Sequence, residues 1–265
     1  MRQRSRPAAH STIGKPPAER VLWARVETET EQRWHLESVL MLGAGLMGSI
    51  AVGMVAVTSL HALAPKLPVG TEKFLAFIIS AVAFQGVTLL LTHVLLRMHH
   101  RSWREFLGLG KPDLSRAVLF GVATGALVLP GAYLLNELSG LILTYLQGDA
   151  ELQTSVRVLQ LTVTLGQRVC FAIAAVVLAP ICEEILFRGI LYDLLKQLGW
   201  PRLGLAISSL FFGLIHGNAM TLVPLSFLAV ILALLYDQTR NLMAPIVAHA
   251  VFNLVNFLTF VLQPK

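Results

Sequence analysis

Seven apolar stretches, separated by short polar segments, follow one another along this 265-residue chain. Most of them are long enough to cross a bilayer core, which needs about 20 helical residues. They cover roughly residues 39–63, 74–96, 117–146, 168–198, 203–216, 222–236 and 242–262. The pattern predicts an all-α fold, a polytopic transmembrane helical bundle of about seven helices, with six to eight as the range. Residues 153–167 decide between seven and eight, because they suit either a loop or a helix at the membrane surface.

The composition also indicates a membrane protein. Hydrophobic residues make up 55% of the chain and charged residues 14%, whereas soluble domains have about 25% charged residues. We therefore expect one membrane domain rather than two soluble domains. The two cysteines, Cys170 and Cys182, lie in apolar runs and lack the spacing of a disulfide framework or a CxxC metal motif. We interpret both as packing residues.

The first 36 residues differ from the rest, because they are polar and rich in arginine and proline. We predict that residues 1–36 form a polar, partly disordered cytoplasmic tail and that residues 37–265 form the transmembrane helical domain. A short helix in the headgroup region around Trp23 is the alternative for part of the tail. Since the first apolar run begins near Val39, we expect no cleavable signal peptide.

The distribution of basic residues predicts the orientation in the membrane. Of the 21 lysines and arginines, 15 lie in the tail or in segments that a count of seven spans places on the same side. Four lie on the other side, and two lie within the fourth apolar run. By the positive-inside rule the N-terminus is cytoplasmic, and an odd number of spans then places the C-terminus outside.

Two carboxylates and a guanidinium interrupt the fourth apolar run, namely those of Glu183, Glu184 and Arg188. Charged groups at membrane depth are costly and by default suggest a functional site. Glu184 and Arg188 are four residues apart, so on a helix they share a face and can pair. Glu183 is rotated from Glu184 by about 100°, which leaves it as a candidate general base or acid. Pro180, one turn earlier, is expected to kink the helix and free a backbone carbonyl.

Later runs add three polar groups at comparable depth. His216 ends the fifth run, and His249 and Asn253 share one face of the seventh run. Counted from the same membrane side, Glu183, His216 and Asn253 lie roughly 22, 20 and 18 Å deep, and His249 lies roughly 12 Å deep. We expect the four side chains to meet in one cavity near the midplane. The purely structural alternatives are an internal ion pair in the fourth run, packed histidines and a helix-bridging asparagine.

Other features suit structural roles. The pair Gly121-xxx-Gly125 in the third run indicates close helix packing. His61 and His93 have no partners at matching spacing, and we interpret them as structural or interfacial residues.

Together, the three polar motifs resemble the CPBP intramembrane endopeptidase family. This family includes type 2 CAAX prenyl proteases, bacteriocin-processing proteins and lysostaphin-resistance-like proteins. Its motifs EExxxR, FxxxH and HxxxN are matched in order by Glu183-Glu184-xxx-Arg188, Phe212-xxx-His216 and His249-xxx-Asn253. The resemblance covers about residues 165–262, within a protease-like core of about residues 117–262.

The resemblance implies a membrane-embedded endopeptidase that hydrolyses peptide bonds of membrane-anchored or lipid-modified (CAAX-type) substrates. Glu183 and His216 would activate water, while His249 and Asn253 would stabilise the oxyanion. Structural support would come from Glu184, Arg188 and Phe212. The expected partners are a membrane-embedded peptide or lipidated protein substrate and the lipid bilayer, without nucleic acid.

The resemblance favours a glutamate-dependent mechanism without a cofactor. Zinc is the alternative, in which Glu183, His216 and His249 would supply three ligands and water the fourth. The chain contains no HExxH pair, and asparagine is an unusual zinc ligand.

Two non-proteolytic functions compete with the protease. One is a non-enzymatic membrane immunity or scaffold protein, as in bacteriocin self-immunity. The intact motif set argues against it. The other is a transporter that uses the carboxylates as a proton relay, but transporters often contain internal repeats, and we find none in this sequence.

Overall fold

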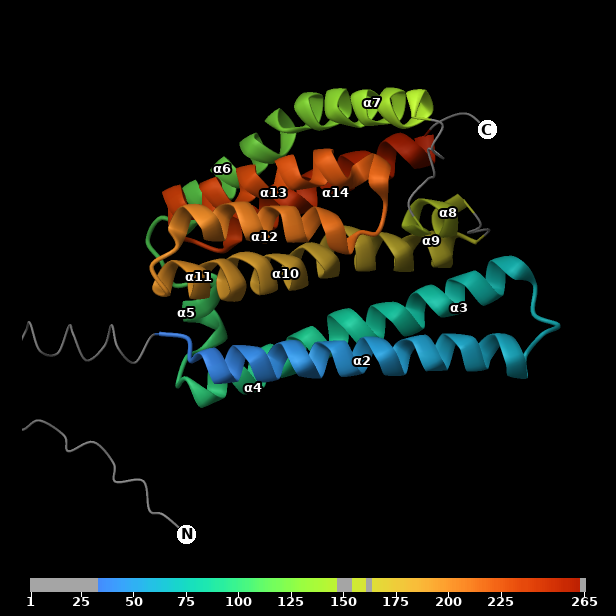
Figure 1. Cartoon of the computed structure of the whole chain (residues 1–265), viewed down its shortest axis with the longest axis horizontal. Coiled ribbons are helices and arrows are strands. Elements are labelled where there is room, and N and C mark those ends of the chain that lie inside the picture. Colours follow the sequence, from blue (N-terminus) through green and yellow to red (C-terminus); the bar gives the residue numbers. More distant parts are fainter. Residues whose placement is uncertain (1–32, 147–153, 161–163, 263–265) are drawn as a thin grey trace, which may run out of the picture. The chain divides into compact units, whose positions relative to one another are not determined.

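A computed structural model describes residues 33–146, 154–160 and 164–262 (Figure 1). The chain divides into two units, residues 1–33 and 34–265, and the helices described below belong to the second unit. The predicted tail, apart from its last few residues, lies outside the described residues.

All regular structure in the described ranges is helical, as the apolar pattern predicts. The helices are α2 (Leu36–Leu63), α3 (Val69–Ala81), η1 (Val82–Gly86), α4 (Val87–Met98), α5 (Trp103–Leu107), α6 (Leu114–Leu127), α7 (Leu129–Tyr145), α8 (Thr154–Gln160), α9 (Leu165–Ala172), η2 (Ile173–Leu178), α10 (Ala179–Glu184), η3 (Ile185–Tyr192), α11 (Asp193–Gln197), α12 (Pro201–Ile215), α13 (Ala219–Thr239) and α14 (Met243–Leu262). The labels η1 to η3 denote π-helical segments, whose turns are wider than those of an α-helix.

Within the described residues, six helical stretches are long and apolar enough to cross a membrane. They are Leu36–Leu63, Val69–Met98, Leu114–Tyr145, Leu165–Gln197, Ala219–Thr239 and Met243–Leu262. The predicted fifth run forms α12, which is apolar but has only 15 residues. The prediction of a transmembrane bundle of six to eight helices is therefore confirmed. The ambiguous stretch 153–167 contains the short helix α8 and the start of α9, while residues 161–163 lie outside the description.

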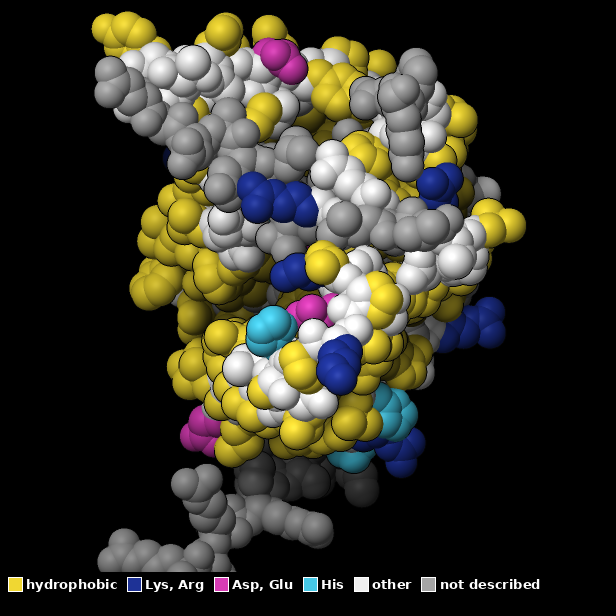
Figure 2. Space-filling model, turned by 90° about the vertical axis from the view of Figure 1, so that its right-hand side faces the viewer, with side chains coloured by type: hydrophobic (Ala, Val, Ile, Leu, Met, Phe, Trp, Pro, Cys, Tyr) yellow, Lys and Arg dark blue, Asp and Glu magenta, His cyan; other side chains and the backbone are white. Residues whose placement is uncertain are grey.

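Apolar side chains cover much of the outer surface of these helices. Val52 and Leu63 on α2 are 71% and 85% exposed, and Leu127 on α6 is 79% exposed. Figure 2, which views the molecule from the end where α2 meets α3, shows hydrophobic side chains along the flanks of the bundle. Such a surface is suited to lipid rather than to water.

The pair Gly121 and Gly125 lets α6 approach α14 closely. A Cβ atom added to Gly121 would lie 2.6 Å from the carbonyl oxygen of Ala244, and one added to Gly125 would lie 2.5 Å from that of Ala248. Both distances are too short for a side chain, so glycine is required at this contact. The packing role predicted for these two glycines is confirmed, and it holds the helix that carries His249.

The helical stretch Leu165–Gln197 contains two π-helical segments, η2 and η3, on either side of α10. Pro180 is the second residue of α10, the helix that follows η2, and it has no N–H to donate to the preceding turn. In η2 the carbonyl oxygens of Ala174 and Ala175 accept side-chain hydrogen bonds from Gln85 and Asn253. The irregular backbone expected near Pro180 is thus present, and it serves as an anchor for side chains from two other spans.

Polar contacts join the first helices to the stretch Leu165–Gln197. At the start of α2, the Trp34 indole N–H donates to the carbonyl oxygen of Gly189, and its backbone N–H donates to Gln197, both at 2.9 Å. Deeper in the bundle, the side-chain amide of Gln85 on η1 donates to the carbonyl oxygen of Ala174. The backbone carbonyl oxygen of Gln85 accepts from the thiol of Cys182 at 3.5 Å. Cys182 is fully buried, in keeping with the packing role predicted for it.

Candidate active site

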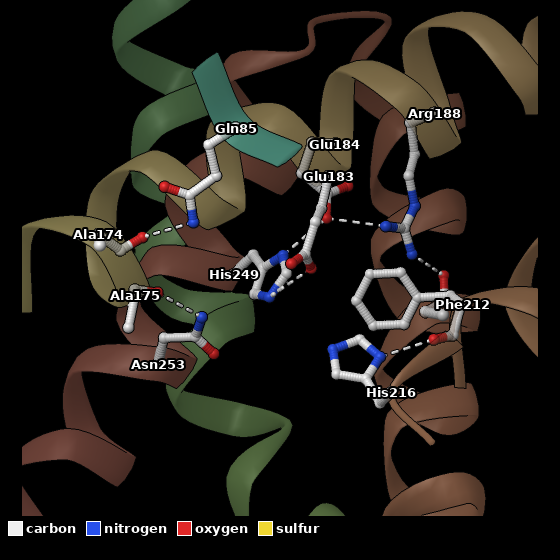
Figure 3. A network of polar contacts seen from close by, with 11 residues as sticks. Gln85, Ala174, Ala175, Glu183, Glu184, Arg188, Phe212, His216, His249 and Asn253 are labelled. Atoms are coloured by element: carbon white, nitrogen blue, oxygen red, sulfur yellow. Dashed lines mark hydrogen bonds and ion pairs between the residues drawn. The ribbon is translucent and has the colours of Figure 1, made fainter. Parts of the chain in front are cut away.

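Glu184 and Arg188 form the buried ion pair that their spacing predicts (Figure 3). The guanidinium Nη1 donates to Glu184 Oε1 at 2.8 Å, and Nη2 donates to the carbonyl oxygen of Ala229 at 2.7 Å. The side chains of Glu184 and Arg188 are 0% and 2% exposed. The guanidinium also lies 5.1 Å from the ring centroid of Phe212. This pair therefore ties the fourth span to α12 and α13.

His249 lies between the two carboxylates. Its Nδ1 is 2.8 Å from Glu184 Oε1, and its Nε2 is 3.8 Å from Glu183 Oε2. Because Glu184 Oε1 also accepts a hydrogen bond from Arg188, it acts as an acceptor toward His249, so Nδ1 of His249 carries a proton. Glu183 itself is 14% exposed, whereas Glu184 is completely buried. The two adjacent glutamates therefore have different environments, as their positions on the helix predict.

His216 directly follows α12, where Phe212 fixes its orientation. Its Nδ1 donates to the carbonyl oxygen of Phe212 at 2.7 Å, and the two rings lie 4.9 Å apart. The Phe212 ring also packs edge-on against His249 at 5.7 Å. A carbonyl oxygen has no proton to give, so Nδ1 of His216 carries the proton and Nε2 of the neutral ring keeps its lone pair. The phenylalanine of the FxxxH motif thus orients one histidine and touches the other.

Asn253 projects from α14 one turn beyond His249. Its Nδ2 donates to the carbonyl oxygen of Ala175 at 2.8 Å. This bond uses one of the two amide N–H groups, so the other N–H and the carbonyl oxygen have no partner among the described residues. Figure 3 shows the Asn253 oxygen turned away from Ala175.

Two cavities lined by described residues meet at Glu183 and His216. The first, about 640 Å³, lies between α2, η1, η3 and α12, and nearly all its other lining residues are apolar. It occupies the half of the bundle in which α2 begins. The second, about 490 Å³, extends into the other half and is also lined by His249 and Asn253. All four predicted site residues therefore face one common cavity, although they come from three separate helical stretches.

Sequence reasoning missed three amide side chains that line the second cavity, those of Gln85, Asn136 and Asn256. Each is a polar residue within an apolar run, which was the available signal. No partner at a recognisable spacing marked Gln85 or Asn136, and Asn256 lies one turn beyond Asn253 on the same helix.

The residues proposed for the zinc alternative do not assemble into a metal site. Among the residues that the structure describes, no three histidine, cysteine, aspartate or glutamate side chains lie close enough together to hold a metal ion. Glu183 and His249 approach each other, but His216 does not complete a coordination group with them. The side chains as placed do not fit zinc.

His61 and His93 lie outside both cavities. His61 Nδ1 lies 2.9 Å from a Glu72 carboxylate oxygen near the turn between α2 and α3. His93 accepts a hydrogen bond from the Trp103 indole at 3.1 Å. These partners agree with the structural or interfacial roles predicted for both residues.

Comparison with known proteins finds a similarity for the segment that carries the motifs. Residues 165–255 match the family model described as "Type II CAAX prenyl endopeptidase Rce1-like". A protein of Bacillus subtilis (strain 168), named "Putative membrane peptidase YdiL", is 34% identical over 82 residues. This alignment covers 31% of the present chain and 33% of that protein, so it spans about a third of the relative. No solved structure matches the chain.

These matches confirm the resemblance to the CPBP intramembrane endopeptidase family, since the matched residues 165–255 contain all three motifs. With six apolar helices of spanning length among the described residues, the chain is a multi-pass membrane protein, and its residues 165–255 are similar to a family of membrane endopeptidases.

Proposed function

We propose that this protein is an intramembrane endopeptidase that hydrolyses a peptide bond of a membrane-anchored or lipid-modified substrate. The observation that carries the proposal is the common cavity lined by Glu183, His216, His249 and Asn253. Four polar groups from three separate helical stretches have no structural need to share one cavity at membrane depth, where each is costly.

Water activation is assigned to Glu183 and His216. Nε2 of neutral His216 keeps its lone pair, and Glu183 is the less buried of the two carboxylates. As the water oxygen attacks the carbonyl carbon, its proton passes to this pair. When the C–N bond breaks, the same proton is returned to the leaving amine, so the enzyme ends each cycle in its starting state.

Oxyanion stabilisation is assigned to His249 and Asn253. The second amide N–H of Asn253 supplies one hydrogen bond to the developing negative charge. Since Nδ1 of His249 already donates to Glu184, the ring donates from Nε2 only when both nitrogens carry protons. Glu184 thus acts as a positioning residue that holds this ring between the oxyanion site and Glu183.

The size of the apolar cavity supports a lipid-modified substrate. A transmembrane helix of 20 residues, about 30 Å long and 10 Å wide, occupies roughly 2,400 Å³. The apolar cavity holds about 640 Å³, which is about a quarter of that volume. It suits a single apolar chain or a short extended segment better than a folded helix, and it ends at Glu183 and His216.

The direct test uses a quenched fluorescent peptide with one isoprenyl thioether on a cysteine, presented to the full-length protein in nanodiscs. Wild-type protein should release a product whose new terminus is identified by mass spectrometry, and Glu183→Gln should release none while remaining folded. Equal cleavage by the two proteins would remove Glu183 from the mechanism, whereas no cleavage by either protein would favour a non-enzymatic scaffold. Proton-coupled flux in vesicles that persists without cleavage would favour a transporter.

The metal question is tested on the same preparation. We propose a metal-free reaction, so turnover should survive dialysis against a strong chelator, and elemental analysis should find no stoichiometric zinc. Loss of turnover on chelation, with recovery on zinc addition, would show that the side chains rearrange to form a metal site.

The orientation is also part of the proposal. Single cysteines placed in the tail and near the C-terminus should react with an impermeant thiol reagent from the cytoplasmic and the outer side, respectively. Labelling of both from one side would correct the number of spans.

A further inference from the structure

Amide side chains gather in the second cavity, in the half of the bundle away from the start of α2. Asn253 and Asn256 on α14, Asn136 on α7 and Gln85 on η1 all line it. The apolar cavity on the other side of Glu183 contains no amide side chain. The two cavities that meet at Glu183 therefore differ in chemistry, because one is lined by amides and the other is almost entirely apolar.

Three of these amides use their nitrogen on a backbone carbonyl. Asn256 Nδ2 donates to Phe252 at 2.8 Å, and the corresponding bonds of Asn253 and Gln85 go to Ala175 and Ala174. A carbonyl oxygen only accepts hydrogen bonds, so in each case the nitrogen must face it and the amide oxygen must face elsewhere. None of these three amide oxygens accepts a hydrogen bond from the described residues, and that of Gln85 is buried.

Asn136 adds an amide from a different helix. It forms no hydrogen bond with the described residues, so both its N–H groups and its oxygen are open to a ligand in the cavity. Along α14, Asn253 and Asn256 are separated by a rise of about 4.5 Å. The cavity therefore presents a short row of acceptors on α14, with an amide on α7 that also lines the space.

A peptide substrate in this place needs such acceptors. Every non-proline residue brings one backbone N–H, and at membrane depth no bulk water accepts from it. An extended segment, the conformation in which a scissile bond is open to attack, leaves its N–H groups without helical partners. Amide oxygens satisfy these groups without adding charge.

Resting on the proposed function, we infer that the amide-lined cavity is the binding site for the extended peptide backbone of the substrate beside the scissile bond. Asn256 and Asn136 are binding residues in this site, and the apolar part of the substrate lies on the opposite side of Glu183. The bound peptide thus runs from the catalytic groups along α14, toward the C-terminal end of this helix.

Backbone esters test this inference, because an ester removes one N–H and changes no side chain. In the quenched isoprenyl peptide, each amide within three residues of the scissile bond, but not the scissile bond itself, is replaced by an ester in turn. With wild-type protein, at least one ester should raise KM about fivefold with kcat nearly unchanged, the effect of one lost hydrogen bond.

With the Asn256→Leu protein, the parent peptide should already show the raised KM. The ester that raises KM with wild-type protein should then cause no further increase. Asn136→Leu provides a second, independent variant on another helix. Thr259→Leu, a polar-to-apolar change at an exposed position of α14 outside the cavity, serves as the matched control and should retain the full ester effect.

The ester effects separate this inference from the proposed function. If wild-type protein does not cleave the parent peptide, the proposed function fails. If it cleaves the peptide but every ester raises KM equally in wild type and both variants, the endopeptidase stands and the backbone-binding site is refuted. Loss of the ester effect in Thr259→Leu would refute it as well.

Discussion

Replacing Arg188 by methionine tests whether the buried ion pair supports the fold. Glu184 is fully buried, and its Oε1 accepts from both Arg188 and His249 at 2.8 Å. Its Oε2 has no hydrogen-bond partner among the described residues. In Arg188→Met the carboxylate would keep one hydrogen bond and lose its cation. Removing one partner of a buried pair typically costs about 3–5 kcal/mol, because a charge is left uncompensated.

The loss is measured by thermal unfolding of the purified protein in detergent. A cost of this size corresponds to a decrease in Tm of about 10 °C for a domain of comparable length. Arg97→Met is the matched control, since Arg97 is exposed at the end of α4 and forms no buried pair. It should change Tm by about 1 °C or less, as expected for a surface substitution.

A double variant separates stability from catalysis. In Glu184→Gln/Arg188→Met no uncompensated charge is left, and replacing both members of a buried pair is often neutral. Tm should therefore return most of the way to the wild-type value, while peptide cleavage stays low because His249 has lost its anionic partner. An Arg188→Met protein with the Tm of the wild type would refute this reasoning, and so would a double variant with full cleavage activity.

Three further substitutions give separate expectations. Asn253→Ala should lower kcat by about 10²–10³ without loss of folded protein, as measured for lost oxyanion donors; an unchanged kcat would remove Asn253 from the mechanism. Gly125→Ala should lower both Tm and activity, because its Cβ would meet the Ala248 carbonyl oxygen, whereas Gly48→Ala, with open space around it, should leave Tm unchanged. Pro180→Ala restores a backbone N–H beside η2. It should reduce cleavage, because Asn253 would be displaced from Ala175, and it should not lower Tm. Cleavage at the wild-type rate would show that the proline does not maintain η2.

Local sequence rules predicted much of the fold. The apolar runs gave the spans because bilayer thickness imposes helix length. The spacing of Glu184 and Arg188 gave their pairing, and the Gly121-xxx-Gly125 pair gave the close contact with α14, because both depend on helix geometry alone. The common depth of the motifs predicted the shared cavity, whereas the apolar cavity beside it was not predicted.

The missed features depend on irregular backbone and on contacts between distant segments. No periodicity marks the π-helical segments η1 to η3, because each follows from how neighbouring spans satisfy its carbonyl groups. Gln85 is 89 residues away from Ala174, to which it binds. Its role could not be read from either segment alone. The tail lies outside the described residues, so its predicted cytoplasmic position and partial disorder stay predictions.

The two site histidines illustrate what the structure adds to a motif. Apart from the motifs that carry the family resemblance, nothing in the sequence distinguishes His216 from His249, as each is a single imidazole in an apolar run. In the structure, Nδ1 of His216 donates to a neutral carbonyl, and Nδ1 of His249 donates to a carboxylate that also binds Arg188. The first arrangement leaves Nε2 of His216 without a hydrogen bond to the described residues, and the second places the His249 ring between two carboxyl groups. The proposed division of labour between base and oxyanion donor rests on these different acceptors. The acceptor of His249 belongs to another helical stretch, whereas that of His216 belongs to the helix that the histidine follows.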